Sequence, residues 1–400
     1  MATSETGCLK RAPIVFVWWM IRLLLVLVMA AESLAGLPLA EPDAVGLDAQ
    51  RLQRIDEIVA EGLAEKKMPG CVVCVGRHGK IAFLKAFGQK RLQPSELPMA
   101  TDTLFDMASI TKPMATATSI MLLIERGQLR LTDKVASILP DFAVNGKEPI
   151  TIHDLLIHHS GLLADNSIKD YEHGHDEAIK RICDLKLLNP IGTKFVYSDV
   201  NFILLGEIVA KVSEKNVHEF SREHLFAPLG MKSTGYLPSE ELRVKAAPTE
   251  QRDGHWMLGE VHDPRAFKLG GVAGHAGLFS TAEDVAVYAQ MMLGRGEYGG
   301  ARVLSPETVE RMTRGDRVSS GVRGLGWDKR TGYSINRGEL LSDSAFGHGG
   351  FTGTVLWIDP ELDLFFIFLS NRVHPNGKGS VNQLAGRIAT VVASAIREKK

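Results

Sequence analysis

Ser109 and Lys112, three residues apart, are the side chains of this sequence best placed for chemistry. On a helix, residues at this spacing share one face, so the amine could act as a base for the serine hydroxyl. Burial penalises the charged form of a lysine and lowers its pKa, so we expect Lys112 to work as a neutral amine. Unpaired N–H groups at a helix N-terminus would also favour a serine alkoxide. The pair alone is a weak signal, because a helix cap beside an exposed lysine gives the same pattern.

Two later motifs contain further groups suited to acyl transfer. Tyr197 and Asp199 stand two residues apart, just before an apolar segment. His348, Gly349 and Gly350 lie in a run typical of a strand, and a second predicted strand follows closely. Glycines in a strand permit another group to approach the backbone closely. Taken by itself, Tyr197 would be interpreted as a half-buried packing residue.

In order and separation, the three motifs resemble those of the β-lactamase-related serine hydrolases. This group includes class C β-lactamases, low-molecular-weight penicillin-binding proteins and esterases built on the same scaffold. The resemblance covers residues 47–397, with further matching stretches at residues 103–108, 129–140, 151–162, 261–263, 277–284 and 324–327. It implies an α/β fold in which helices flank an antiparallel sheet, with a mostly helical lobe at about residues 109–281.

The resemblance also implies a role for each reacting group. Ser109 would be the nucleophile, Lys112 its partner, and Tyr197 the group that passes a proton to the leaving group and then activates water. The oxyanion donors would be the backbone N–H groups of Ser109 and Phe351, since acyl transfer needs a nucleophile, a base and oxyanion donors together. A tyrosine with a pKa of about 10 is a poor base in water. A neighbouring ammonium favours the phenolate, so we expect Lys112 and Tyr197 to titrate as a coupled pair.

Substrate contacts are expected from Asp199, His348, Gly349, Gly350 and Phe351. His348 stands where β-lactamases and many carboxypeptidases have lysine, so a permanent cation is replaced by a group mostly neutral at about pH 7. The lost charge-assisted hydrogen bond is worth roughly 1.5–3 kcal/mol, and its loss favours neutral esters over anionic substrates. Asp199 replaces the usual asparagine and cannot donate an amide N–H to a substrate carbonyl, which disfavours amides.

The sequence therefore leaves three hypotheses for the function of this protein. The leading hypothesis is an exported serine esterase that works through an acyl-enzyme on Ser109. The second is a D-alanyl-D-alanine carboxypeptidase or β-lactamase that acts on peptidoglycan-like amides. The third is a non-catalytic binding or sensor protein on the same scaffold, which the intact nucleophile, amine and phenol make the weakest. The sequence has no Gly-x-Ser-x-Gly elbow, which argues against an ordinary α/β-hydrolase.

Other candidate groups are weaker, and we expect neither a metal nor a cofactor. Cys71 and Cys74 lie in a predicted strand, where residues three apart face opposite sides, so packing is favoured over redox or metal chemistry. His275, in a glycine-rich loop at residues 270–277, could border the cleft and touch substrate. We interpret His153, His158 and His159 as packing or capping residues. His173, His175 and Asp176 lie in a polar loop and could form a metal site by chance.

The elements around the motifs predict one sheet made from both ends of the chain. A first helix is expected at residues 47–68, and strands at residues 71–75 and 81–87 are joined by a turn at His78 and Gly79. Strands at residues 353–358 and 362–369 and a terminal helix at residues 380–397 close the domain. The cleft would lie between this sheet and the helical lobe.

The composition fits one large catalytic unit. The 400 residues are 45% hydrophobic, enough for a substantial core, and the net charge of −1 implies no basic surface, so nucleic acid is not an expected partner. The expected partner is a small-molecule ester or a peptidoglycan-like substrate. We assign residues 36–46 to a linker and residues 47–397 to the catalytic domain. Cys71, Cys74 and Cys183 are an odd number and give no disulfide framework.

Residues 1–35 are expected to be a signal peptide or a membrane anchor. The apolar segment at residues 14–29 contains Arg22, which costs roughly 2.5–3.5 kcal/mol at the centre of a spanning helix. A start at Met20 would instead leave a short basic region, an apolar core and a small-x-small cleavage site at residues 33–35. We therefore expect an exported protein, periplasmic or extracellular, with membrane association through this segment as the alternative.

Overall fold

The computed structural model describes residues 1–2 and 36–397, and its centre is a nine-stranded antiparallel sheet. In spatial order the strands are β10 (Asp316–Val318), β11 (Gly321–Arg323), β12 (Asp328–Arg330), β13 (Phe346–Gly350), β14 (Thr354–Asp359), β15 (Leu364–Ser370), β1 (Gly70–Arg77), β2 (Lys80–Arg91) and β3 (Leu97–Pro98). The N-terminal hairpin thus pairs with the last strand of the chain, with Cys74 opposite Ile367. This confirms the predicted sheet built from both ends.

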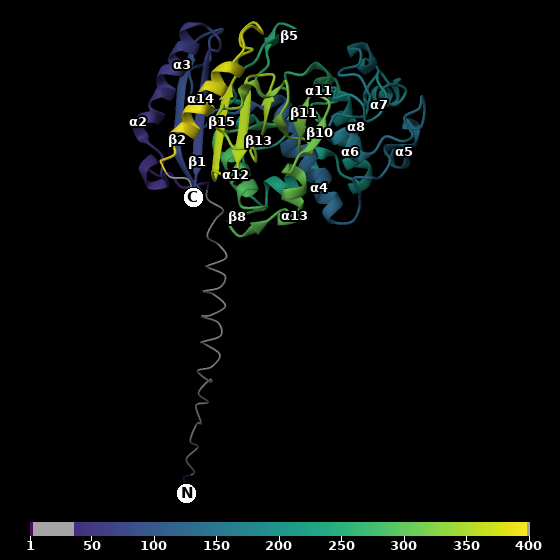
Figure 1. The fold of residues 1–400 in the computed structure, drawn as a ribbon, viewed down its shortest axis with the longest axis horizontal. Helices are drawn as coiled ribbons and strands as arrows, with labels where there is room; N and C mark the ends of the chain where they lie inside the picture. Colours follow the sequence, from purple (N-terminus) through teal and green to yellow (C-terminus); the bar gives the residue numbers. More distant parts are fainter. Residues whose placement is uncertain (3–35, 398–400) are drawn as a thin grey trace. The chain divides into compact units, whose positions relative to one another are not determined.

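The central strand β15 explains why the sheet is covered on both faces. All seven of its residues are buried, and they alternate between two cores. Leu364, Phe366 and Phe368 pack with α3 (Arg54–Ala64) and α14 (Asn382–Ser394), whereas Phe365 and Ile367 pack on the side of α12 (Ala282–Leu293). A continuous apolar run is what a strand between two helical layers requires. Figure 1 shows α3 and α14 together along β1, β2 and β15.

The β1–β2 hairpin forms as predicted. His78 and Gly79 take φ values of +53° and +73°, as a tight two-residue hairpin turn demands. Cys71 belongs to the core beneath α14 and Cys74 to the core on the opposite face, and both thiols are buried and free. The cysteines are therefore packing residues, as the strand periodicity predicted, and burial raises the pKa of each thiol.

The flanking segments differ from the prediction in detail. The first helix is divided at Gln53 into α2 (Ala49–Leu52) and α3. Residues 36–46, expected to be a linker, run along β2, where the N–H of Ala40 donates to the carbonyl of Ile81 at 2.9 Å. The predicted leader lies outside the described residues except for residues 1 and 2. No helix in the described part of the chain combines the length and apolarity needed to cross a membrane.

The middle of the chain forms the expected helical lobe, and Figure 1 shows α5 to α8 gathered away from α3 and α14. Its α-helices are α4 (Thr118–Glu125), α5 (Val135–Ile138), α6 (Ile152–Leu156), α7 (His175–Cys183), α8 (Asp199–Ser213), α9 (Val217–Ser221), α10 (Glu240–Arg243) and α11 (Pro264–Lys268), and α13 (Pro306–Thr313) follows α12. Short two-stranded pairs join β4 (Phe105–Asp106) to β7 (Phe279–Ser280), β5 (Gln251–Arg252) to β6 (His255–Trp256) and β8 (Glu297–Tyr298) to β9 (Ala301–Arg302).

The glycine-rich loop at residues 270–277 packs directly on helix α8. A Cβ atom at Gly274 would lie 2.0 Å from the carbonyl oxygen of Phe202 and 2.9 Å from the amide nitrogen of Gly206. Both contacts are with backbone atoms, which cannot move aside as a flexible side chain can. The absence of a side chain at residue 274 therefore fixes the distance between this loop and the helix.

We predict that Gly274→Ala destabilises the protein by about 1–3 kcal/mol, the usual cost of overpacking a core. The loop that carries His275 must move away from α8, so activity should fall as well. Urea unfolding measures the first effect. Gly235→Ala is the matched control, because the nearest atom to a Cβ there is 3.9 Å away. Equal stability of the two variants would contradict the proposed backbone contact.

Candidate active site

Ser109 lies in a short 3₁₀ turn, η2 (Ala108–Ile110), beside the sheet. Ala108 has a φ of +46°, and its N–H donates to Asp106 Oδ1 at 2.8 Å. The hydroxyl of Thr354, on β14, donates to the carbonyl of Met107 at 3.1 Å. These bonds tie the strained backbone before the serine to the sheet. The helix that follows begins as a π-helical segment, η3 (Lys112–Ala117), and continues as α4.

The side chain of Lys112 is completely buried, and its ammonium makes two hydrogen bonds and one ion pair. Nζ lies 3.0 Å from Ser109 Oγ, 3.0 Å from the carbonyl oxygen of His275 and 2.6 Å from Asp199 Oδ1. An ammonium has three donors and no acceptor, so this arrangement fits the charged form. The predicted pair of serine and amine is thus brought together, with Asp199 behind it.

The structure overturns the expectation that Lys112 is a neutral amine. Burial lowers the pKa of Lys112, but the charge of Asp199 opposes burial, and the pKa is raised above its ordinary value. The sequence argument considered burial alone. Asp199, which we expected to contact substrate, forms an ion pair with Lys112 and does not line the cavity.

Tyr197 is held over the lysine by aromatic neighbours. Lys112 Nζ lies 5.0 Å from its ring centroid, and the rings of His158, Tyr333 and His348 lie 4.7, 4.9 and 5.9 Å away. Burial raises the pKa of Tyr197, and this outweighs the opposing charge of Lys112. The resting side chain is therefore a phenol, which corrects the expected phenolate. Its hydroxyl has no hydrogen-bond partner among the described residues.

The third motif lies on β13, against the serine turn. His348 Nδ1 donates to the carbonyl of Gly349 at 2.8 Å, while its Nε2 has no partner in the described structure. Burial, together with the charges of Arg323 and Lys112, holds the pKa of His348 well below its usual range. A Cβ atom at Gly350 would lie 2.5 Å from the carbonyl oxygen of Met107. The absence of a side chain at Gly350 therefore allows the serine turn to pack closely against β13.

A cavity of about 350 Å³ opens in front of these groups. Its walls include six of the predicted site residues: Ser109, Tyr197, His348, Gly349, Gly350 and Phe351. Lys112 and Asp199 are absent from the cavity wall. The side chain of Phe351 is 59% exposed and stacks on His262 at the cavity rim. The nucleophile and the phenol thus face an open space, with the charged pair behind them.

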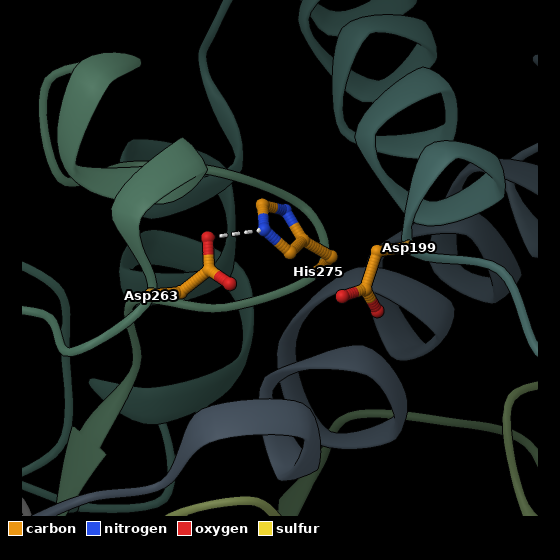
Figure 2. A group of neighbouring side chains, drawn as sticks. All are labelled: Asp199, Asp263 and His275. Atoms are coloured by element: carbon orange, nitrogen blue, oxygen red, sulfur yellow. Dashed lines mark hydrogen bonds and ion pairs between the residues drawn. The ribbon is translucent and has the colours of Figure 1, made fainter. Parts of the chain in front are cut away.

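Asp199, Asp263 and His275 form a second cluster at the back of the site. Figure 2 shows His275 between the two carboxylates, and its Nε2 lies 2.9 Å from Asp263 Oδ1. Their ligand atoms all lie within 4.8 Å of one another, close enough to hold a metal ion. However, the ammonium of Lys112 already contacts Asp199 and the backbone of His275, so a divalent cation would be placed against a fixed positive charge. We therefore interpret His275 as a residue that positions Lys112.

Three more of the predicted histidines contact other side chains or the backbone. His158 is buried, its Nδ1 accepts the N–H of Ser198 at 3.0 Å, and it orients the Tyr197 motif. His153 contacts Asp316 at 3.0 Å, and His175 contacts Asp176 and Glu207, both at 3.1 Å. The sequence analysis predicted that His158 packs in the core but did not predict its contact with the Tyr197 motif.

Sequence reasoning missed the three charged residues of the cavity wall, Arg323, Asp328 and Arg372, of which Arg323 is the most deeply buried. Arg323 ends β11, and its side chain has no exposed surface. Arginines are seldom fully buried, so nothing in the sequence indicated this position. The signal available was its place directly before the matching stretch at residues 324–327.

The fold and the arrangement of serine, lysine and tyrosine define the class of this protein as a serine hydrolase. The family model named Beta-lactamase matches residues 55–390, and the chain belongs to that family. It is 34% identical over 362 residues to the N-acetylmuramyl-L-alanine amidase of Bacillus subtilis (strain 168), covering 81% of this chain and 82% of the relative.

Two further similarities agree with this assignment. The chain is 31% identical over 395 residues to a protein of Escherichia coli (strain K12) named "Putative D-alanyl-D-alanine carboxypeptidase", covering 89% of this chain and 91% of the relative. Its fold matches the solved structure of "EstCE1, a hydrolase with promiscuous acyltransferase activity" with a TM-score of 0.69 at 21% identity. That match covers 87% of this chain and 99% of the other.

We predict that Asp199→Asn destabilises the protein by about 3 kcal/mol at pH 7, because it leaves a buried ammonium without its counter-ion. Burial would then lower the pKa of Lys112 below that of an unfolded lysine. The unfolded chain then binds more protons, so the variant gains stability as the pH rises from 7 towards about 10. In the wild type the pKa of Lys112 is raised in the folded state. The ion pair between Lys112 and Asp199 therefore loses its contribution to the free energy of unfolding only when the pH rises above the pKa of an unfolded lysine.

Urea unfolding at pH 7 and at pH 9.5 measures this difference. The matched control is Asp102→Asn, because Asp102 pairs with Lys245 at 2.9 Å while both side chains are about half exposed. Such a pair is worth at most about 1 kcal/mol. A penalty for Asp199→Asn that did not shrink with rising pH would contradict the assigned charges.

Proposed function

We propose that this protein is a serine hydrolase that cleaves amide bonds of peptidoglycan-type peptides through an acyl-enzyme on Ser109. The observation that carries the proposal is the 3.0 Å contact between Ser109 Oγ and Lys112 Nζ at the wall of an open cavity. A nucleophile in hydrogen-bond contact with a proton-transfer partner is the arrangement that acyl transfer requires.

The resting charges suggest how protons move. Lys112 can accept the proton of Ser109 only after it gives one of its own to Asp199, 2.6 Å away. Tyr197, a phenol in the resting state, donates its proton to the leaving nitrogen. Water then attacks the acyl-enzyme and returns a proton to Tyr197, while Ser109 regains its proton from Lys112. In this scheme Asp199 holds the lysine proton until Ser109 is regenerated and then returns it to Lys112, which restores the resting ammonium and carboxylate.

The choice between amide and ester rests on opposing observations. The names of relatives that match over more than four fifths of the chain favour an amide from the cell wall. The neutral His348 and the engagement of Asp199 with Lys112 favour an ester, since neither supplies a cation or an amide donor to substrate. The cavity wall does contain another cation, Arg323, which weakens the argument from His348. We therefore place the amide first and the ester second.

We also propose, from the sequence alone, that the protein is exported. The basic, apolar and small residues that follow Met20 support this, and a substrate from the cell wall would be met outside the cytoplasm.

We predict that Ser109→Ala lowers the hydrolysis rate at least about a thousandfold, because the acyl-enzyme can no longer form. A fluorophosphonate probe should label the wild type on Ser109, as peptide mass mapping would show. Ser380→Ala is the matched control, since Ser380 also lines the cavity but makes no hydrogen bond to a lysine or histidine in the described part of the chain. Labelling of Ser109→Ala at the wild-type rate would exclude this serine as the nucleophile.

We predict hydrolysis of acyl-D-Ala-D-Ala or of N-acetylmuramyl-L-alanine, measured as release of the free amino acid. The ester control is acyl-D-Ala-D-lactate, which differs from the first peptide by one oxygen in place of N–H. Turnover of both amide and ester supports the first proposal. Turnover of the ester alone would favour the esterase, and turnover of neither would leave simple acyl esters as the substrates to test.

A further inference from the structure

Two backbone N–H groups at the cavity wall have no acceptor. Ser109 and Phe351 both line the cavity, and neither N–H donates to any group in the described part of the chain. The two segments lie against each other, because a Cβ atom at Gly350 would be 2.5 Å from the carbonyl oxygen of Met107. Two free donors in such a place fit the expected oxyanion hole. Their segments are far apart in the sequence, so other bonds must hold the two donors in register.

The buried carboxylate of Asp106 makes two of these bonds. Asp106 ends β4 and is 3% exposed. Its Oδ1 accepts the N–H of Ala108 at 2.8 Å, and its Oδ2 accepts the N–H of His262 at 2.7 Å. A carboxylate has two acceptor oxygens and no donor, so it can serve both N–H groups at once. One side chain therefore fixes the residue directly before Ser109 and the backbone of His262.

His262 extends this constraint to Phe351. The two rings stack, with centroids 5.6 Å apart and an angle of 27° between their planes. Glu250 holds the imidazole, because its Oε2 lies 2.7 Å from His262 Nε2. The guanidinium carbon of Arg372 lies 4.4 Å from the same Phe351 centroid. Phe351 is largely exposed, so these contacts rather than burial hold its side chain.

The main chain of β4 makes a second connection to the turn that carries Phe351. The hydroxyl of Thr352 donates to the carbonyl of Asp106 at 2.7 Å, and both residues are buried. The residue after Phe351 is thus bonded directly to Asp106. Side chain and main chain of one residue therefore reach both segments that carry the free N–H groups.

We propose that Asp106 is the positioning residue of the oxyanion hole and sets the distance between the N–H groups of Ser109 and Phe351. The inference rests on the proposed acyl transfer at Ser109 and adds a residue outside the three motifs. Asp106 is absent from the cavity wall, so it acts on one donor through Ala108 and on the other through His262.

The first test is Asp106→Asn, because an amide keeps the shape of the carboxylate but has only one acceptor oxygen. Its NH2 group would face a backbone N–H, so either Ala108 or His262 must move. Burial raises the pKa of Asp106 and its two N–H bonds oppose that rise, so the assay is run at about pH 8, where the wild-type carboxylate is ionised. With p-nitrophenyl acetate as substrate, we expect kcat to fall about ten- to a hundredfold and KM to stay within a few-fold, as for displaced rather than lost donors.

The infrared band of the acyl-enzyme carbonyl measures the hole itself. Hydrogen bonds to a carbonyl oxygen lower its stretching frequency, so Ser109 acylated with a ¹³C-labelled ester should absorb at a lower frequency in the wild type than in Asp106→Asn. Thr352→Val removes only the hydroxyl bond to the carbonyl of Asp106. It should move the band in the same direction by a smaller amount, and it carries the test if Asp106→Asn does not fold.

Asp284→Asn is the matched control. Asp284 Oδ2 also accepts a backbone N–H, that of Ser233 at 2.8 Å, together with the hydroxyl of Thr234 at 2.9 Å. Asp284 does not line the cavity and makes no hydrogen bond to the serine turn or to Phe351 in the described part of the chain. Its variant should lose stability but keep the wild-type carbonyl band and kcat.

Two results would overturn the proposal. One is a carbonyl band that stays at the wild-type frequency in both Asp106→Asn and Thr352→Val. The other is a fall in kcat and a band shift of equal size in Asp284→Asn, which would trace both effects to lost stability. A wild type that forms no acyl-enzyme would contradict the proposed function instead. Amide hydrogen exchange then decides on Asp106: faster exchange at Ala108 and His262 in Asp106→Asn supports its role, and unchanged exchange at both counts against it.

Discussion

The site depends on one buried ammonium. Lys112 has no exposed surface, and its charge is tolerated only because it pairs with Asp199 and donates hydrogen bonds to the carbonyl of His275 and the hydroxyl of Ser109. These acceptors come from helix α8, from the glycine-rich loop and from the serine turn. A charge in the protein interior needs such partners to persist. The packing of the lobe around the cleft is therefore also what sets the protonation state of the reacting groups.

The sequence predicted the parts of the fold that repeat simple patterns. The β1–β2 hairpin, the apolar strands β14 and β15, and the terminal helix all carry apolar periodicity with turn residues between them. Strands β10, β11 and β12 were not predicted, because they have three residues each and are rich in charged side chains. Their pairing is set by neighbours in the sheet, and no local pattern encodes it. Arg323 lies on one of these strands and was missed for that reason.

The three motifs were placed together correctly, but their charges were not. Burial alone predicts a neutral lysine, and an adjacent cation alone predicts a phenolate. In the structure each group has a further neighbour, and Asp199 reverses the first expectation while burial reverses the second. Protonation in a buried cluster depends on every neighbour at once, and one sequence names the residues without giving their distances.

Ala108 gives the nucleophile its direction and has a consequence for the whole molecule. Its left-handed backbone is of a kind that costs about 1–3 kcal/mol, and the bond from its N–H to Asp106 holds it there. A variant in which residue 108 took an unstrained φ would be more stable to heat, but its Ser109 side chain would no longer be oriented for attack. Thermal stability and catalytic rate are thus opposed at Ala108. Attempts to make this hydrolase more heat-resistant should therefore leave Ala108 and its bond to Asp106 unchanged.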